Sequence, residues 1–192
     1  MAKNKIPTRV ECEAILAGYS VDPAIVRHSR LVADVAQRIA VALARSGVAL
    51  NQDLVLASAL LHDLAKGHPE HASVGAAILR SMDFPQVATV VSSHTDLDFN
   101  GRLDECAVVY LADKLVSGER LVTIDQNFEA ALRRSGDHPA ALDAVQRRMA
   151  TAKAVALAVE TRVGAALASV VNEDSGPLAK ADASLSGEAG KL

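Results

Sequence analysis

Six side chains that commonly bind metal ions lie on, or at the end of, apolar helical patterns in this chain. They are His28, His62, Asp63, His71, His94 and Asp113. A single histidine on a buried face is usually a hydrogen-bonded core residue, but these six come from five separate expected helices. Burying such groups without partners is costly, so a shared ion explains the joint pattern. Four imidazoles and two carboxylates without a thiolate suit Fe, Mn, Co, Zn or Mg. The sequence therefore predicts one or two divalent metal ions.

The chain is organised around the apolar run from Leu54 to Leu61, which ends in His62-Asp63. A helix that is apolar on all sides must be buried. Adjacent helical residues point about 100° apart, so His62 and Asp63 can converge only on an ion seated between their two directions. Lys66 follows about one turn after His62. It lies too far along the helix to be a ligand of the same ion.

Caps, breakers and apolar spacing predict helices in most of the chain. The expected helices run from Thr8 to Tyr19, Pro23 to Gly47, Asn51 into His62-Asp63, His71 to Met82, Pro85 to His94, Cys106 to Lys114, Ile124 to Arg134 and Pro139 to Val171. In the fourth of these, His71, Val74, Ile78 and Met82 are expected to form the buried face. No strand is expected.

The composition agrees with an all-α fold. The chain has 192 residues, of which 50% are hydrophobic and only 3% aromatic, a mixture that favours packed helices over a sheet. We expect one domain over residues 1–171, with a core at 22–134 and a C-terminal helix at 139–171. Residues 172–192 are rich in Gly, Ser, Ala and Lys without periodicity, and we expect a flexible tail there.

The net charge and the hydropathy of the chain limit the kinds of partner that we expect. The net charge of −3 gives no sign of a nucleic-acid-binding surface. No uninterrupted apolar stretch reaches membrane length and no signal peptide is recognisable, so a cytoplasmic protein is expected. The long helix at 139–171 is expected to pack on the body, and its length also permits a contact in a homodimer.

Three segments resemble the HD superfamily of metal-dependent phosphohydrolases. They are His28-Ser29-Arg30, Leu61-His62-Asp63-Leu64-Ala65-Lys66 and Tyr110-Leu111-Ala112-Asp113-Lys114-Leu115. The resemblance spans about Val26 to Arg120 and implies a compact helical bundle of the HD-domain type, here followed by a long C-terminal helix.

The resemblance also implies roles for the six side chains. By that likeness His28, His62, Asp63 and Asp113 hold one metal ion. His71 and His94 are similar to the additional histidines of two-metal members, in which a carboxylate like that of Asp63 bridges both ions.

Finer likenesses concern the substrate. The His-x-x-x-Gly-Ala segment that begins at His71 and the Ala-Asp-Lys segment at Asp113 resemble bacterial HD hydrolases that split symmetric dinucleoside tetraphosphates. The chain is also similar to HD domains joined to nucleotidyltransferase domains of the molybdenum-cofactor type, which implies association with such a domain as one alternative. It departs from the first group at Val116–Arg120, where a Glu-Pro-Gly-Arg-like string is expected.

The function expected from these features is hydrolysis of a phosphoester or pyrophosphate bond in a nucleotide or another phosphorylated small molecule. Asp63 and Lys66 are the expected catalytic residues, and Lys66, Lys114 and Arg120 are expected to bind the substrate's phosphate. Two alternatives stay open: a nucleotide-sensing or partner-binding domain with little turnover, and a diiron oxygenase on the same scaffold.

Overall fold

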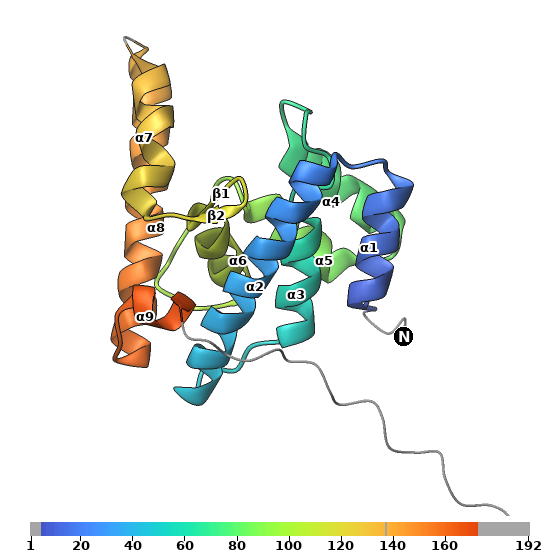
Figure 1. Ribbon diagram of the computed structural model, residues 1–192, viewed down its shortest axis with the longest axis horizontal. Coiled ribbons are helices and arrows are strands. Elements are labelled where there is room, and N and C mark those ends of the chain that lie inside the picture. The colour runs from blue at the N-terminus through green and yellow to red at the C-terminus, as the bar shows by residue number, and fades with distance from the viewer. Residues whose placement is uncertain (1–4, 137, 173–192) are drawn as a thin grey trace, which may run out of the picture.

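The computed structural model describes residues 5–136 and 138–172, which form helices and one very short hairpin (Figure 1). The helices are α1 (Arg9–Gly18), α2 (Pro23–Arg45), α3 (Gln52–Leu61), α4 (His71–Ser81), α5 (Pro85–Ser93), α6 (Glu105–Lys114), α7 (Ile124–Ser135), α8 (Pro139–Val163) and α9 (Leu167–Asn172). The all-α prediction is confirmed. Of the tail expected at 172–192, Asn172 ends α9, and 173–192 lie outside the described residues.

The expectation of no strand is wrong at one place. Strands β1 (Val116–Ser117) and β2 (Arg120–Leu121) form an antiparallel hairpin in which Val116 pairs with Leu121. The sequence indicated only the turn, because two-residue strands are too short to show an alternating pattern. The hairpin follows α6 directly and lies against α2.

Side-chain caps set the starts of the first three helices as expected. The Thr8 hydroxyl accepts from the Glu11 N–H while the Glu11 carboxylate accepts from the Thr8 N–H, which is a complete capping box. Asp22 accepts from the Ala24 N–H at 2.7 Å, and Asn51 accepts from the Leu54 N–H at 3.1 Å. Each cap satisfies backbone donors that have no partner within the first turn of a helix.

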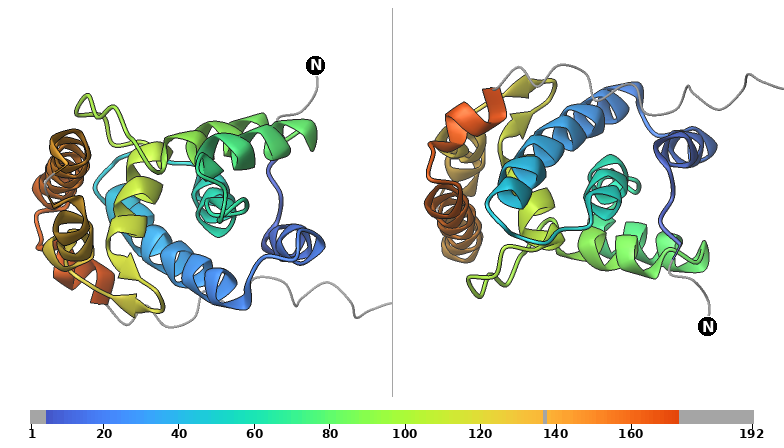
Figure 2. Two further views of the ribbon diagram at one scale, coloured as in Figure 1. Left: turned by 90° about the horizontal axis from the view of Figure 1, so that it is seen from above. Right: turned by 90° about the horizontal axis from the view of Figure 1, so that it is seen from below.

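The core is centred on α2 and α3, which lie side by side, with α5 and α6 packed around them (Figures 1 and 2). From Leu54 to Leu61 every residue of α3 is buried except the half-buried Leu56. The prediction that this apolar run is enclosed on all sides is therefore confirmed. Its enclosure also places the residues that follow, His62 and Asp63, inside the molecule.

Helix α4 buries a different face from the predicted one. Small residues and Leu79 lie inside, namely Ala72, Gly75, Ala76 and Leu79, whereas the predicted stripe of His71, Val74, Ile78 and Met82 is half-buried. A Cβ at Gly75 would lie 3.6 Å from a methyl of Val91 and 3.9 Å from Ala65. The small residues let α4 approach α5 closely, and the larger ones are displaced to the edges of the contact.

The expected helix over 139–171 is two helices in the structure. α8 ends at Val163 because Gly164 takes the left-handed conformation, with φ 74° and ψ 23°, and α9 follows after a short turn. The second half of α8 packs on the body through Ala152, Val155 and Val159, while α7 runs alongside it and extends with it beyond the body (Figure 1). Neither α8 nor any other helix of the described residues has the length and hydropathy that crossing a membrane requires.

Candidate metal centre

The six predicted metal-binding side chains meet where five helices begin, end or pass. We call them the His/Asp cluster: His28 on α2, His62 and Asp63 after α3, His71 at the start of α4, His94 after α5, and Asp113 near the end of α6. His62 and His94 are the C-cap residues of their helices. The buried face shared by α3, α5 and α6 brings three of these helix ends together.

One part of the cluster, the His28 group, consists of His28, His62 and Asp113. The Asp113 Oδ1 atom lies 3.2 Å from His28 Nε2 and 3.4 Å from His62 Nε2. The two rings are tilted against each other, with their centroids 5.4 Å apart. Three ligand-type atoms from three helices thus face one point.

The other part, the His94 group, consists of His62, Asp63 and His94. His94 Nε2 lies 3.4 Å from Asp63 Oδ1, and His62 Nε2 lies 3.5 Å from Asp63 Oδ2. His71 adjoins this group, because its Nε2 is 3.3 Å from Asp63 Oδ1 and 3.2 Å from His94 Nε2. The Asp63 carboxylate therefore faces three imidazoles, and His62 belongs to both groups.

Backbone carbonyls orient three of the four rings. The Nδ1–H of His62 donates to the Ala59 carbonyl at 2.8 Å, and that of His94 donates to the Val91 carbonyl at 2.7 Å. Both acceptors lie in the last turn of the preceding helix, where carbonyls lack intrahelical partners. His28 Nδ1 donates to the Gly118 carbonyl at 2.9 Å. A carbonyl only accepts, so Nδ1 of each of these rings carries a proton, and Nε2 is directed at the carboxylates.

The two carboxylates are ionised at neutral pH. Burial alone would raise the pKa of Asp63, but the His62 ring, hydrogen bonds from His71 and His94, and the Lys66 ammonium hold this pKa below its usual range. Burial opposes ionisation of Asp113 as well, and Lys114, His28 and His62 keep the pKa of Asp113 well below its usual value.

The cluster fits a metal ion in its donor types, its spacing and one unused nitrogen. His62 is fully buried, yet its Nε2 has no hydrogen-bond partner among the described residues. Ligand atoms that share an ion at about 2.0–2.2 Å in a tetrahedral or octahedral shell lie roughly 3–3.5 Å apart. The nitrogen-to-carboxylate separations in both groups, 3.2 to 3.5 Å, fall in this range. Nitrogen and oxygen donors with ring N–H groups held by carbonyls are typical of metal sites.

The three predicted phosphate-binding residues differ in their surroundings. The Lys66 ammonium lies 2.9 Å from Asp63 Oδ2, and its side chain is 47% exposed. Arg120 is exposed on β2 and makes no side-chain ion pair with the other described residues. Lys114 instead points inward: its ammonium lies 2.6 Å from Asp113 Oδ2, 3.2 Å from the His94 carbonyl oxygen and 5.0 Å from the centre of the Tyr110 ring. With 12% of its side chain exposed, Lys114 is held beside Asp113, and its contact with a substrate phosphate stays a prediction.

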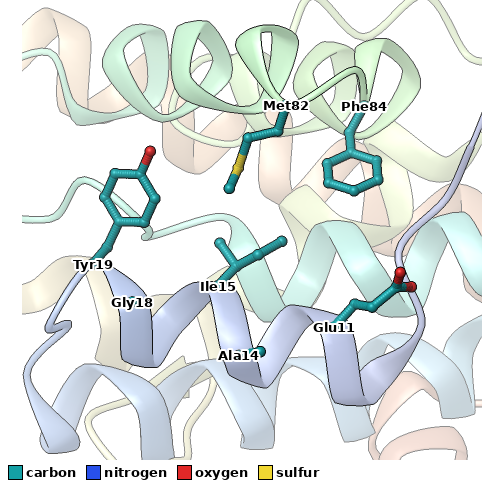
Figure 3. Close-up of a pocket in the computed structure, with 7 residues that line it drawn as sticks. All are labelled: Glu11, Ala14, Ile15, Gly18, Tyr19, Met82 and Phe84. Atoms are coloured by element: carbon teal, nitrogen blue, oxygen red, sulfur yellow. The ribbon is translucent and has the colours of Figure 1, made fainter.

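A separate hollow of about 510 Å³ opens between α1 and the α4–α5 connection (Figure 3). Ile15, Met82 and Phe84 give it an apolar lining, with Glu11 and Tyr19 at its edge. None of its lining residues belongs to the His/Asp cluster. This hollow therefore lies apart from the residues that could carry out chemistry in this molecule.

Sequence reasoning missed the contribution of the hairpin to the cluster. The Ser117-Gly118 pair is a common turn signal, so the turn itself could have been predicted. Its role could not, because the contribution of Gly118 is a backbone carbonyl, which any residue possesses.

Comparison with known proteins agrees with this geometry. The HD domain family profile matches residues 25–118, a range that contains the whole His/Asp cluster. A tRNA (cytidine(56)-2'-O)-methyltransferase of Picrophilus torridus is 29% identical over 140 residues, which cover 63% of this chain and 40% of that protein. An uncharacterized protein of Methanocaldococcus jannaschii is 28% identical over 135 residues, which cover 60% of this chain and 80% of that protein. No solved structure matches the chain.

The sequence identity to these two relatives is too low to assign their activities to this chain. The chain spans less than half the length of the methyltransferase, so a methyltransferase activity does not follow from that match. The family profile match, with the His/Asp cluster inside it, supports membership of this chain in the HD superfamily.

Proposed function

We propose that this chain is a metal-dependent phosphohydrolase that cleaves a phosphoester or pyrophosphate bond of a nucleotide or a related phosphorylated small molecule. The observation that carries the proposal is the His/Asp cluster with a half-exposed lysine at its edge. The profile match to the HD domain supports it independently.

The chain's own residues have distinct tasks in this proposal. The His28 group and the His94 group would each hold an ion. The one free nitrogen of His62 would bind one of them, the two carboxylate oxygens of Asp63 could serve both, and His71 lies at the edge of the second group. When bound, such ions lower the pKa of water and polarise a phosphoryl oxygen. The Nδ1–H bonds to Ala59, Val91 and Gly118 hold the rings in place with Nε2 facing the ion sites, so the ligands need no reorientation during turnover.

Lys66 supplies the contact with substrate. Its ammonium already lies beside the Asp63 carboxylate and is partly exposed, so it can donate to a phosphate oxygen that arrives next to Asp63. A positive charge there stabilises the negative charge that develops on the phosphoryl group as the bond breaks. Arg120, exposed on the hairpin, is the second candidate for phosphate contact.

The identity of the substrate and that of any partner stay predictions. Dinucleoside tetraphosphates are the first substrates to test, given the Ala-Asp-Lys and His-x-x-x-Gly-Ala segments. Association with a nucleotidyltransferase domain also stays a prediction.

A combined metal and activity measurement tests the function. The purified chain is loaded in turn with iron, manganese, cobalt, zinc and magnesium, its metal content is measured, and phosphate release is screened over nucleotides, dinucleoside polyphosphates and sugar phosphates. We expect bound metal and release from at least one nucleotide class, and no release from His62→Ala prepared in parallel, which excludes a contaminating phosphatase. A metal-loaded chain that releases no phosphate from any substrate would contradict the proposal.

A further inference from the structure

The orienting carbonyl of His28 differs in origin from those of His62 and His94. The latter two rings donate to a carbonyl three residues earlier in their own helix. His28 lies in the second turn of α2, where the preceding carbonyls accept the N–H bonds of the helix itself. Its Nδ1–H must therefore find an acceptor elsewhere, and it finds the Gly118 carbonyl, 90 residues later in the chain.

The turn that presents this carbonyl is held from several sides. Gly118 has φ +59°, a left-handed conformation that glycine adopts without strain. The residue after it, Glu119, accepts from Arg27 Nε at 2.7 Å, and Arg27 is the neighbour of His28 on α2. At the base of the hairpin, the Asn127 side chain donates to the Val116 carbonyl at 3.0 Å. The hairpin is thus tied to α2 beside His28 and to α7 at its base.

We propose that the β1–β2 hairpin is a positioning element for the His28 group, with Gly118 and Glu119 as its positioning residues. The Gly118 carbonyl accepts from His28 Nδ1–H and so holds the ring with Nε2, the nitrogen available to an ion, 3.2 Å from Asp113 Oδ1. The Arg27–Glu119 pair keeps that carbonyl in place. This inference rests on the proposed function in one respect, that His28 is a metal ligand.

The same hairpin also carries the exposed side chain of Arg120. Arg120 extends from β2, two residues after Gly118 and opposite Ser117. A change in the turn therefore reaches both a metal ligand and a predicted phosphate-binding side chain. Neither Gly118 nor Glu119 touches the reacting atoms in this scheme, so their effect passes through His28.

The first experiment changes the turn itself. A β-branched residue is strongly disfavoured at positive φ, so Gly118→Val should displace the carbonyl. With Zn²⁺ as the probe, a competition titration against a chelator should show about tenfold weaker binding of one ion, the lower end of the loss typical when an orienting partner is removed. ¹⁵N-histidine NMR of the zinc-loaded protein should show the Nδ1–H, Nε2-coordinated form of His28 in the wild type and the loss of this form in Gly118→Val, a change that general destabilisation would not produce.

Gly101→Val is the matched control. Gly101 has φ +90° in an exposed loop, and a Cβ there would meet nothing within 4 Å, as at Gly118. The strain is similar, but no contact joins Gly101 to the cluster. Zinc affinity and the His28 tautomer should match the wild type.

The second experiment exchanges charges. Arg27→Glu and Glu119→Arg should each weaken zinc binding by about two- to fivefold, the range of an exposed ion pair, and the double variant should restore it. The pair Arg30–Glu13 is the control, because Arg30 lies one turn further along α2 with similar exposure but contacts α1 instead. Its exchanged variants should bind zinc as the wild type does.

The outcomes separate this inference from the proposed function. A wild-type chain that binds no metal contradicts the function. A wild-type chain that binds zinc while Gly118→Val retains both its affinity and its His28 tautomer overturns the role of the hairpin. Equal losses in Gly118→Val and Gly101→Val overturn it as well, since they would show only general destabilisation.

Discussion

The two halves of the His/Asp cluster are built over different distances along the chain. In the His94 group, His62 and Asp63 are adjacent, and both rings are held by carbonyls of the helices they terminate. In the His28 group, the ligands come from α2, from the end of α3 and from α6, and the His28 ring is held by a carbonyl of the hairpin. The geometry of the His94 group therefore depends mainly on where helices end, and that of the His28 group depends on how helices far apart in the chain pack together.

The halves also differ in exposure. The side chains of His62, Asp63 and His94 are at most 3% exposed, whereas those of His28 and Asp113 are 15% and 16% exposed. A catalytic metal needs an open coordination position, whereas a closed site only holds its ion. The three ligands of the His94 group are thus the more enclosed ones, while His71 at 18% and Lys66 at 47% exposure leave an open edge beside Asp63. The following predictions, in order of decreasing effect on metal content, test this distinction.

His62→Ala should have the largest effect, because His62 lies between the two halves and its removal leaves the buried carboxylates of Asp63 and Asp113 without the imidazole beside them. The variant should lose nearly all bound metal by elemental analysis and all phosphohydrolase activity. His68→Ala is the control, since His68 is an exposed histidine in the loop before α4. A full metal complement in purified His62→Ala would rule out this site.

His28→Ala and the double variant His71→Ala/His94→Ala should each remove about one of two ions. The first takes a ligand only from the His28 group, and the second leaves that group intact. Metal-to-protein ratios measured side by side check this. If either variant loses both ions, the halves are not separable and the comparison fails.

Lys66→Ala should leave the metal content unchanged and lower kcat/KM by roughly 10²–10³, the loss typical of removing one donor to developing charge. Lys66→Arg should recover only part of the lost kcat/KM, because a planar guanidinium group does not replace a compact ammonium group. Lys153→Ala, at an exposed lysine of α8 paired with Asp125, serves as the control. Near wild-type kinetics in Lys66→Ala would reduce Lys66 to a surface charge.

Acid should destabilise the metal-free protein through the two carboxylates. Their pKa values are depressed in the fold, so their stabilising contribution is complete above the usual value of 3.8 and is lost as pH falls below it. Near neutrality, the raised pKa of His62 and the lowered pKa of His94 act in opposite directions and partly cancel. Melting temperatures of the metal-free chain between pH 2.5 and 7 should therefore fall most steeply below about pH 4, and Asp113→Asn should flatten that fall.

Much of the molecule was predictable because its signals are local. The caps at Thr8, Asp22 and Asn51 mark helix starts within one turn of sequence, and the apolar run before His62 identifies the central buried helix. The errors have a common cause. The buried face of α4 depends on how closely neighbouring helices approach, and periodicity does not report this distance. The break at Gly164 was available in the sequence, but the apolar stripe continued past it.

The amino-acid sequence alone determined which donors are present, which of them lie at helix ends and that the helix before His62 must be buried. These properties follow from side-chain chemistry and from the spacing of apolar residues along one helix. Only the tertiary structure decided that His28 lies beside His62 and Asp113 and that Lys114 turns toward Asp113. It also decided that the Gly118 carbonyl accepts the hydrogen bond from His28 Nδ1–H. Every residue carries a backbone carbonyl, so which one meets a given ring is set by the packing of segments far apart in the chain.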